Sequence, residues 1–229
     1  MSSFISLFTL SSILALSLHV KSEHLWKGTF DDWSVGFKSE PRERDHYWKI
    51  APNGELHVLG DSSYQTQSGL RTNQKFGNYI LTLEYKWMTP GEGPKFGNSG
   101  IWIHGQEGWD RAGGAFPKSI EVQLKKKAAG DLLRKGLEID EEPGQRSEGE
   151  AVFRRGDESV LEYFYNRWNK VKIVCHEDTI SVWLNDVFIN KAIHCRTRDG
   201  EPVTSGYITL QSEIQNLAFR NIVIEPIKG

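Results

Sequence analysis

Short apolar runs dominate the hydrophobic pattern of this chain, and few stretches carry a helical period. The runs are rich in Ile, Val, Tyr, Phe and Trp and are bounded by Gly, Asn, Asp or Pro, which is typical of antiparallel strands. The pattern predicts strands at Trp48–Ile50, Glu55–Val58, Gly69–Arg71, Tyr79–Trp87, Gly100–His104, Ser119–Leu124, Asn169–His176, Thr179–Leu184, Val187–Asn190, Gly206–Gln211 and Leu217–Pro226. Many short strands without intervening helices indicate an all-β fold of two packed antiparallel sheets.

Two tight hairpins are predicted, at Glu177-Asp178 and Asn185-Asp186, because Asn and Asp adopt turn conformations readily. The segment Lys125–Asn166 is an exception, since it is highly charged and holds few strand signals. A long segment of this kind in a compact domain is usually functional or disordered. No internal repeat or interdomain linker is visible, so we expect a single β-sandwich domain over residues 23–229.

The beginning of the chain has a different character. Residues Phe4 to Val20 are almost all apolar or hydroxyl-bearing, and Lys21 and Ser22 follow them. This run has the length of the apolar core of a secretory signal, and its serines interrupt what a lasting membrane helix of about 20 apolar residues would require. We therefore expect a signal peptide over residues 1–22, a secreted or periplasmic protein, and no membrane association after the signal is removed.

Composition narrows the possible partners. Lys plus Arg total 28 against 30 Asp plus Glu, so the strong basic excess of most nucleic-acid-binding proteins is missing. The chain is rich in aromatic residues, with eight Trp, seven Tyr and eleven Phe, which serve either core packing or the stacking of sugar rings. The two cysteines, Cys175 and Cys195, are a possible disulfide or two buried thiols.

Alternation along the expected strands assigns side chains to faces. In each of four strands, apolar residues alternate with polar or titratable ones. The side chains expected on the face away from the core are Glu84, Lys86, Trp102, His104, Glu121, Gln123, Gln211 and Glu213. If these strands are neighbours in one sheet, the set is either an ordinary solvated face or the lining of a cleft. A His, a Trp and two amides among carboxylates favour the cleft.

Four segments in this order also carry a family resemblance. They are Gly97–Gly105, Phe116–Leu124 followed by Ala129–Asp131, Trp168–Asn185, and Gly206–Glu213 followed by Phe219–Ile222. Together they resemble the 3-keto-disaccharide hydrolase family, and the likeness extends from about Phe30 to Pro226. The sequence departs from the family where His104 stands, since members often carry Arg there.

The resemblance implies a concanavalin-like jelly roll and a carbohydrate substrate already oxidised to a ketone at C3. The ketone makes the C2 proton acidic, so a base can remove it, the enolate expels the C1 aglycone, and water then adds. This chemistry needs a general base and a positive group near the enolate oxygen. We expect Glu121 or His104 as the base and Lys86 or a divalent metal as the positive group. Gln123, Gln211 and Glu213 are expected to hold hydroxyl groups, and Trp102 to stack on the sugar ring.

Other readings of the same residues remain open. His104, Glu121 and Glu84 offer nitrogen and oxygen ligands for a metal, or form a hydrogen-bonded network without one. A conventional glycosidase needs two carboxyl groups, for which Glu121 and Glu213 are candidates. A further alternative is a carbohydrate-binding module without catalysis. The fold does not decide between these alternatives, because function depends on the site rather than on the fold. Neither the sugar, the metal nor the oligomeric state follows from the sequence.

Overall fold

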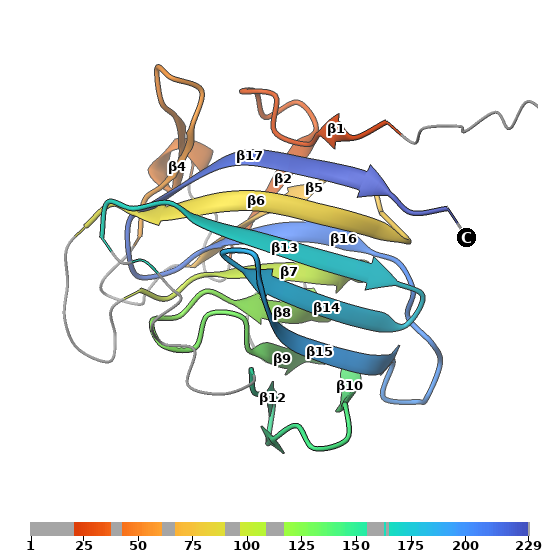
Figure 1. Ribbon diagram of the computed structural model, residues 1–229. Helices are drawn as coiled ribbons and strands as arrows, with labels where there is room; N and C mark the ends of the chain where they lie inside the picture. The colour runs from red at the N-terminus through yellow and green to blue at the C-terminus, as the bar shows by residue number, and fades with distance from the viewer. Residues whose placement is uncertain are drawn as a thin grey trace, which may run out of the picture.

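The predicted strands form two sheets that pack face to face. The structure is a computed structural model, which describes residues 21–37, 43–60, 67–89, 97–108, 117–154, 163 and 165–228. In Figure 1, the sheet that contains β17, β6 and β13 lies over the sheet that contains β16, β7 and β8. The nine-stranded sheet has the order β10 (Glu138–Glu141), β15 (Val187–Arg196), β14 (Thr179–Leu184), β13 (Asn169–His176), β6 (Tyr79–Trp87), β17 (Leu217–Pro226), β4 (Leu56–Val58) and β3 (Trp48–Ile50), with β1 (Glu23–His24) paired to β17.

The eight-stranded sheet has the order β11 (Ser147–Glu148), β12 (Ala151–Val152), β9 (Leu132–Lys135), β8 (Ser119–Gln123), β7 (Gly100–Gly105), β16 (Tyr207–Ser212), β5 (Ser68–Thr72) and β2 (Trp33–Phe37). A 3-10 turn, η1 (Arg44–His46), precedes β3. Neighbours in this order are distant in the chain, as β7 and β16 show. This all-β sandwich of two antiparallel sheets confirms the predicted fold class.

Alternation places the core where the sequence predicted it. Along β6, the residues Leu81, Leu83, Tyr85 and Trp87 are buried, and their neighbours are partly exposed. The facing sheet contributes Ile101 and other buried aliphatic side chains to the same core. Full burial of each such side chain stabilises the fold by about 1.5–3 kcal/mol.

Both predicted hairpins are confirmed. His176 pairs with Thr179 around the first turn, and Leu184 pairs with Val187 around the second. Asn185 and Asp186 both have positive φ, at 49° and 67°, which matches a tight turn between twisted strands. The bounds of the expected strands are correct to within about two residues except for β15, which continues to Arg196.

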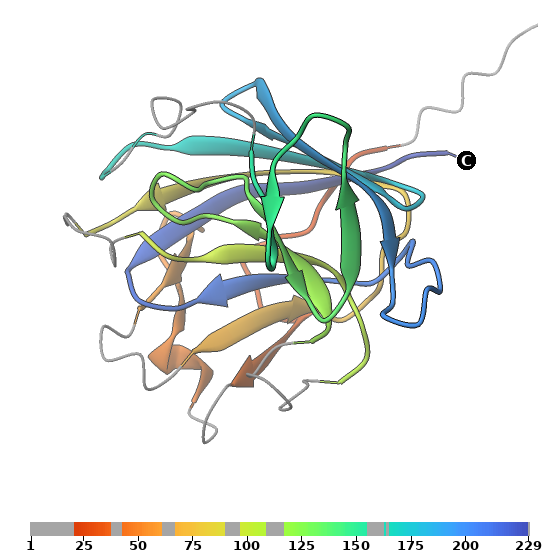
Figure 2. The same cartoon turned by 90° about the horizontal axis from the view of Figure 1, so that it is seen from below.

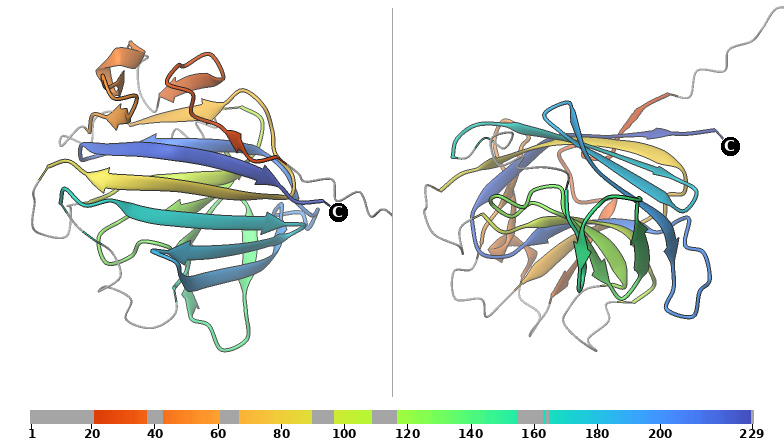
Figure 3. Two further views of the ribbon diagram at one scale, coloured as in Figure 1. Left: turned by 45° about the horizontal axis from the view of Figure 1, so that its top comes forward. Right: turned by 60° about the horizontal axis from the view of Figure 1, so that its bottom comes forward.

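The two ends of the described chain lie side by side. β1 pairs with the end of β17, where Glu23 faces Ile224, and Figure 3 shows the two strands together near the C-terminus. Most of the expected signal peptide, residues 1–20, lies outside the described residues. Among the described residues, no helix has the length and apolar character needed to cross a membrane.

The cysteines are free thiols, both buried. Cys175 lies on β13 and Cys195 on β15, with β14 between these strands. Burial raises the pKa of each thiol to about 12, so both are protonated at neutral pH and pack as small apolar side chains.

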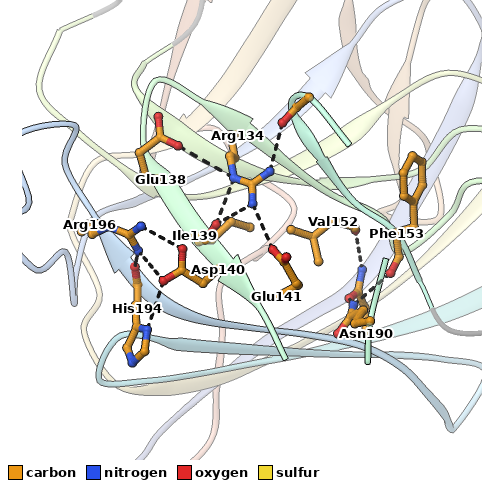
Figure 4. A network of polar contacts seen from close by, with 12 residues as sticks. Arg134, Glu138, Ile139, Asp140, Glu141, Val152, Phe153, Asn190, His194 and Arg196 are labelled. Atoms are coloured by element: carbon orange, nitrogen blue, oxygen red, sulfur yellow. Dashed lines mark hydrogen bonds and ion pairs between the residues drawn. The ribbon is translucent and has the colours of Figure 1, made fainter. Parts of the chain in front are cut away.

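The described part of the charged segment up to residue 154 is more ordered than its composition suggested. It holds β9 to β12, which lie together at one edge of the sandwich (Figure 2). Arg134 donates to the backbone carbonyls of Ile139 and Gly149 at 2.7–3.0 Å, and Asp140 accepts two hydrogen bonds from Arg196 (Figure 4). The expectation of few strands here was wrong, because paired charges stabilise these hairpins where apolar periodicity is weak.

Asn190 lies on β15 of the nine-stranded sheet and connects it to β12 of the eight-stranded sheet. Its amide nitrogen donates to the carbonyls of Gly130 and Val152 at 2.8 and 3.0 Å, its oxygen accepts from Gln145, and the side chain is fully buried. Figure 4 shows Asn190 beside Val152 and Phe153. We expect Asn190→Ala to lower the free energy of unfolding by about 2 kcal/mol, because the buried carbonyls of Gly130 and Val152 lose a donor and the side chain of Gln145 keeps only its hydrogen bond to Phe153. Denaturant unfolding would measure the loss, with the exposed Asn53→Ala as the control. Equal losses in the two variants would contradict this role.

Candidate functional site

Polar side chains form three cross-strand rows on the face of the eight-stranded sheet that points away from the core. The first row follows from direct pairing, since Arg71 pairs with Thr209, Thr209 with Trp102, and Trp102 with Glu121. Directly paired residues project to the same side of a sheet. Four strands, β5, β16, β7 and β8, therefore supply this row.

The second row contains Gln211 and Gln123 with glycine beside each. Gln211 pairs with Gly69, and Gln123 pairs with Gly100. A methyl group added at Gly100 would lie 2.4 Å from Oε1 of Glu121. The carboxyl group of Glu121 thus occupies the space above Gly100, which only a residue without a side chain leaves open.

The third row is centred on Glu213, which follows β16. One oxygen of Glu213 accepts a hydrogen bond from Nε2 of Gln67 at 2.6 Å, and the other accepts one from Nδ2 of Asn98 at 2.5 Å. Two amide donors suit an ionised carboxyl group, which only accepts hydrogen bonds. Glu213 is consequently held from two neighbouring strand ends.

The acid Glu121 has a strongly shifted pKa. Only 4% of the residue is exposed, and burial raises its pKa to about 7. Lys135 lowers the pKa through its positive charge, Glu213 raises it by repulsion, and a hydrogen bond with Trp102 lowers it. A carboxyl group with a pKa near the working pH can both accept and return a proton.

Lys135 reaches Glu121 from β9. Its Nζ lies 3.7 Å from Oε2 of Glu121 and 3.1 Å from Oε2 of Glu150. Lys135 was not among the residues predicted for the site, because it lies in the charged segment with few strand signals. Gly100, Gln67 and Asn98 were not predicted either, although alternation from Trp102 would have placed Gly100 and Asn98 on the same face.

Several polar atoms in these rows are buried and have no hydrogen-bond partner among the described residues. They include Oε1 of Gln123, Oε1 of Gln211 and Oγ1 of Thr209. Buried polar groups are almost always paired in native proteins, so such a cluster requires an explanation. All three atoms can accept a hydrogen bond from a hydroxyl group. The rows are thus suited to a ligand rich in hydroxyls.

Trp102 is placed as predicted, but its surroundings differ from the expectation. Its side chain is buried and interacts with Glu121. An indole in this position supports the acid rather than offering an open ring face to a sugar.

Side-chain alternation along β7 is broken at His104. Trp102 pairs with Thr209 and Gly105 pairs with Tyr207, so Ile103 and His104 together oppose the single core residue Ile208. This β-bulge gives His104 a φ of 53° and interrupts the alternation. His104 is fully buried, and neither ring nitrogen has a hydrogen-bond partner in the described parts of the chain. Burial lowers its pKa to about 4.

Glu84 and Lys86 do not belong to this face. Both lie on β6 of the nine-stranded sheet. Glu84 forms an ion pair with Arg220 at 2.9 Å, and the amine of Lys86 lies 4.4 Å from the ring centroid of Trp168. The expectation that they share one face with Glu121 was wrong, because alternation does not report which strands are neighbours. The proposed metal ligands His104, Glu121 and Glu84 therefore do not come together, and the described residues contain no group of three or more His, Cys, Asp or Glu side chains placed to hold a metal ion.

A separate cavity of about 220 Å³ lies beside β1, β2 and β5. Its charged side chains satisfy one another, since Lys27 pairs with Asp32 at 2.7 Å and with Glu23 at 3.6 Å. None of the three rows lines it. We place the functional site on the rows rather than in this cavity, because the unpaired buried acceptors and the perturbed acid are in the rows.

Comparison with known proteins gives a family match and a fold match. The profile of the 3-keto-alpha-glucoside-1,2-lyase-like domain matches residues 22–225. No curated protein matches the chain by sequence. A crystal structure from Parabacteroides distasonis, described as "Putative glycosyl hydrolase", superimposes with a TM-score of 0.59 at 18% identity, over 90% of this chain and 100% of that one.

Two carbohydrate-binding proteins share the fold. The carbohydrate-binding module CBM66 from Bacillus subtilis has a TM-score of 0.51 at 14% identity, over 85% of this chain and 95% of that one. Lectin I-B4 from Griffonia simplicifolia has a TM-score of 0.52 at 8% identity, over 90% and 98%. At these identities the likeness concerns the fold, and it confirms the concanavalin-like sandwich.

Proposed function

The chain belongs to the 3-keto-alpha-glucoside-1,2-lyase-like family, and from this premise we propose that it cleaves glycosides whose sugar carries a ketone at C3. One observation carries the proposal. The carboxyl group of Glu121 is buried above Gly100 with a pKa of about 7, among polar atoms that can accept hydrogen bonds from sugar hydroxyls. A base with these properties suits the removal of a carbon-bound proton next to a ketone.

In the proposed reaction, the ionised Glu121 removes the C2 proton of the bound keto-sugar. The electrons form an enolate, which expels the C1 aglycone as its alcohol once a proton is supplied to the leaving oxygen. Water then adds at C1 while C2 regains a proton, so the net reaction is hydrolysis. Arg71 and Lys135 are the described cationic side chains that strand pairing places on this face, and either can stabilise the enolate oxygen.

We assign substrate binding to the second and third rows. Gln123 and Gln211 offer amide groups whose oxygens are unpaired among the described residues. Glu213, held by Gln67 and Asn98, adds a fixed hydrogen-bond acceptor. We assign these groups to the hydroxyls of the sugar, since a pocket that pairs each hydroxyl discriminates strongly against analogues lacking one.

A conventional glycosidase is the second candidate. Glu121 and Glu213 form a carboxyl pair in different environments, one buried with a raised pKa and one held by two amide donors. This difference is the pattern of an acid and a partner carboxylate in glycosidases. In this second candidate function the same residues act, but the substrate is an ordinary glycoside without a ketone.

Turnover in deuterium oxide distinguishes the two chemistries. We expect the protein to release the aglycone from a 3-keto-glucoside, at a rate that rises with pH through about 7, and to leave the parent glucoside intact. The product should carry deuterium at C2 beyond the level of an enzyme-free control, because elimination breaks the C2–H bond. Mass spectrometry of the product measures the label.

Other results would redirect the assignment. Cleavage of the parent glucoside without label at C2 would support the glycosidase. Binding of the keto-sugar without turnover would support a carbohydrate-binding module. We also propose that the protein acts outside the cytoplasm, on the basis of the apolar N-terminal run Phe4–Val20.

A further inference from the structure

Lys135 occupies a defined position between two carboxyl groups. Its Nζ lies 3.7 Å from Oε2 of Glu121 and 3.1 Å from Oε2 of Glu150. Its side chain is 34% exposed, whereas that of Glu121 is 5% exposed and that of Glu150 is 70% exposed. Lys135 therefore connects a buried acid to an acid in contact with solvent.

The backbone keeps this arrangement in place. β9 pairs with β8 so that Leu133 faces Glu121 and Lys135 faces Ser119. The amide of Arg134 donates to the carbonyl oxygen of Glu150 at 2.8 Å, and the guanidinium of Arg134 donates to the carbonyl oxygen of Gly149 at 3.0 Å (Figure 4). The turn that carries Glu150 is thus tied directly to the strand that carries Lys135, unlike a pair of free surface side chains.

We propose that Lys135, held by Glu150, is a positioning residue that orients the Glu121 carboxyl group and supplies the positive charge that keeps it available as a base. The proposal rests on the proposed function for its catalytic consequence. Its electrostatic part concerns Glu121 alone and can be measured without substrate.

The charges around Glu121 show why Lys135 matters. β9 presents the cation Lys135, the end of β16 presents the anion Glu213, and β7 presents the neutral indole of Trp102. Glu150 is within ion-pair distance of Lys135. Without Lys135, burial and repulsion by Glu213 both favour the protonated acid, and no other cation among the described residues lowers the pKa of Glu121.

Stability measurements can report the protonation of Glu121 directly. The difference in unfolding free energy between Glu121→Gln and its parent changes with pH as Glu121 titrates. We expect this change to be complete near pH 7 to 8 in the wild-type background. In the Lys135→Met and Lys135→Gln backgrounds it should extend at least one pH unit higher, and in Lys135→Arg it should return close to the wild-type position.

Activity provides the second measurement. Lys135→Met should lose more than ten-fold in turnover of the 3-keto-glucoside at pH 7 and recover much of it at pH 9, while Lys135→Arg retains most of it. Lys191→Met is a matched control, because Lys191 is 33% exposed and paired with Glu142 at 2.5 Å on the other sheet. The control should leave both the titration of Glu121 and the pH profile unchanged.

The outcomes separate this inference from the proposed function. An unchanged titration of Glu121 in both Lys135→Met and Lys135→Gln would overturn the inference, whether or not the wild type is active. A shifted titration in a protein that turns over no keto-glycoside would support the charge assignment and reject the proposed function. A uniform loss of activity at every pH in Lys135→Met, with no rescue by Lys135→Arg, would contradict the positioning role of Lys135.

Discussion

Glu121→Gln is expected to abolish measurable turnover of a 3-keto-glucoside while making the protein more stable at neutral pH. The loss follows because glutamine cannot accept the C2 proton, and a positioned general base contributes about 10²- to 10⁴-fold in rate. The gain follows because the buried carboxyl group has a pKa of about 7 in the folded protein, against an ordinary 4.5. Function and stability therefore make opposite demands at this position.

The sign of the stability effect depends on pH. Below about pH 4.5, Glu121 is protonated in both the folded and the unfolded chain, so its ionisation does not affect folding. Between pH 4.5 and 7, the unfolded chain releases the proton but the folded protein retains it, and the wild type loses stability as pH rises. Above pH 7 the loss is complete, at about 3 kcal/mol from about 1.4 kcal/mol per pH unit.

Urea unfolding of the wild type and of Glu121→Gln between pH 4 and pH 8 would measure this effect. The advantage of the variant should be small at pH 4 and grow toward pH 8. Glu84→Gln is the matched control, since desolvation opposes ionisation of Glu84 but Arg220 and Asn221 outweigh it and hold the pKa of this carboxyl below its usual range. Glu84→Gln should show no stability gain at pH 8 and no loss of turnover. A Glu121→Gln variant that remains active would show that another residue is the base.

Gly100→Ala is expected to reduce kcat/KM by at least about 100-fold, with the fold retained. The new methyl group would lie 2.4 Å from Oε1 and 2.9 Å from Cγ of Glu121, so the carboxyl group must move aside. Displacement of a catalytic group by about 1 Å can cost about 100-fold in rate. The overpacking itself should lower the unfolding free energy by about 1–3 kcal/mol.

Gly77→Ala is the control for this change, because the nearest atom to a methyl group at Gly77 is the carbonyl oxygen of Thr204, at an ordinary 3.9 Å. It should retain the wild-type rate. Turnover assays together with circular dichroism would distinguish a displaced carboxyl group from a lost fold. Full activity in a folded Gly100→Ala protein would contradict the placement of Glu121 above Gly100.

The site brings together residues from separate parts of the chain. Glu121 and Gln123 come from β8, Trp102 and Gly100 from β7, and Gln211 from β16. Strand pairing converts these distant positions into adjacent rows. The same antiparallel sandwich is found in proteins described as lectins and carbohydrate-binding modules, so the buried acid of this chain, rather than its fold, is the basis for proposing catalysis.

Alternation along single strands was sufficient to predict most of the face that carries the site. It placed Trp102, Glu121, Gln123 and Gln211 opposite the core residues of their strands, as the structure has them. It failed at His104, where one inserted residue changes the alternation. A β-bulge depends on hydrogen bonds to the partner strand, and no signal in the sequence around His104 marked it.

The sequence by itself determined the class of fold, the position of most strands and the polar side of each, because side-chain alternation is a local property of an extended backbone. Only the tertiary structure decided which strands are neighbours, since pairing depends on hydrogen bonds between distant segments. That decision moved Glu84 and Lys86 to the other sheet, brought Lys135 to Glu121, and left space above Gly100 for a carboxyl group. The raised pKa of Glu121 has the same origin, because burial is a property of the assembled sheet and its surroundings.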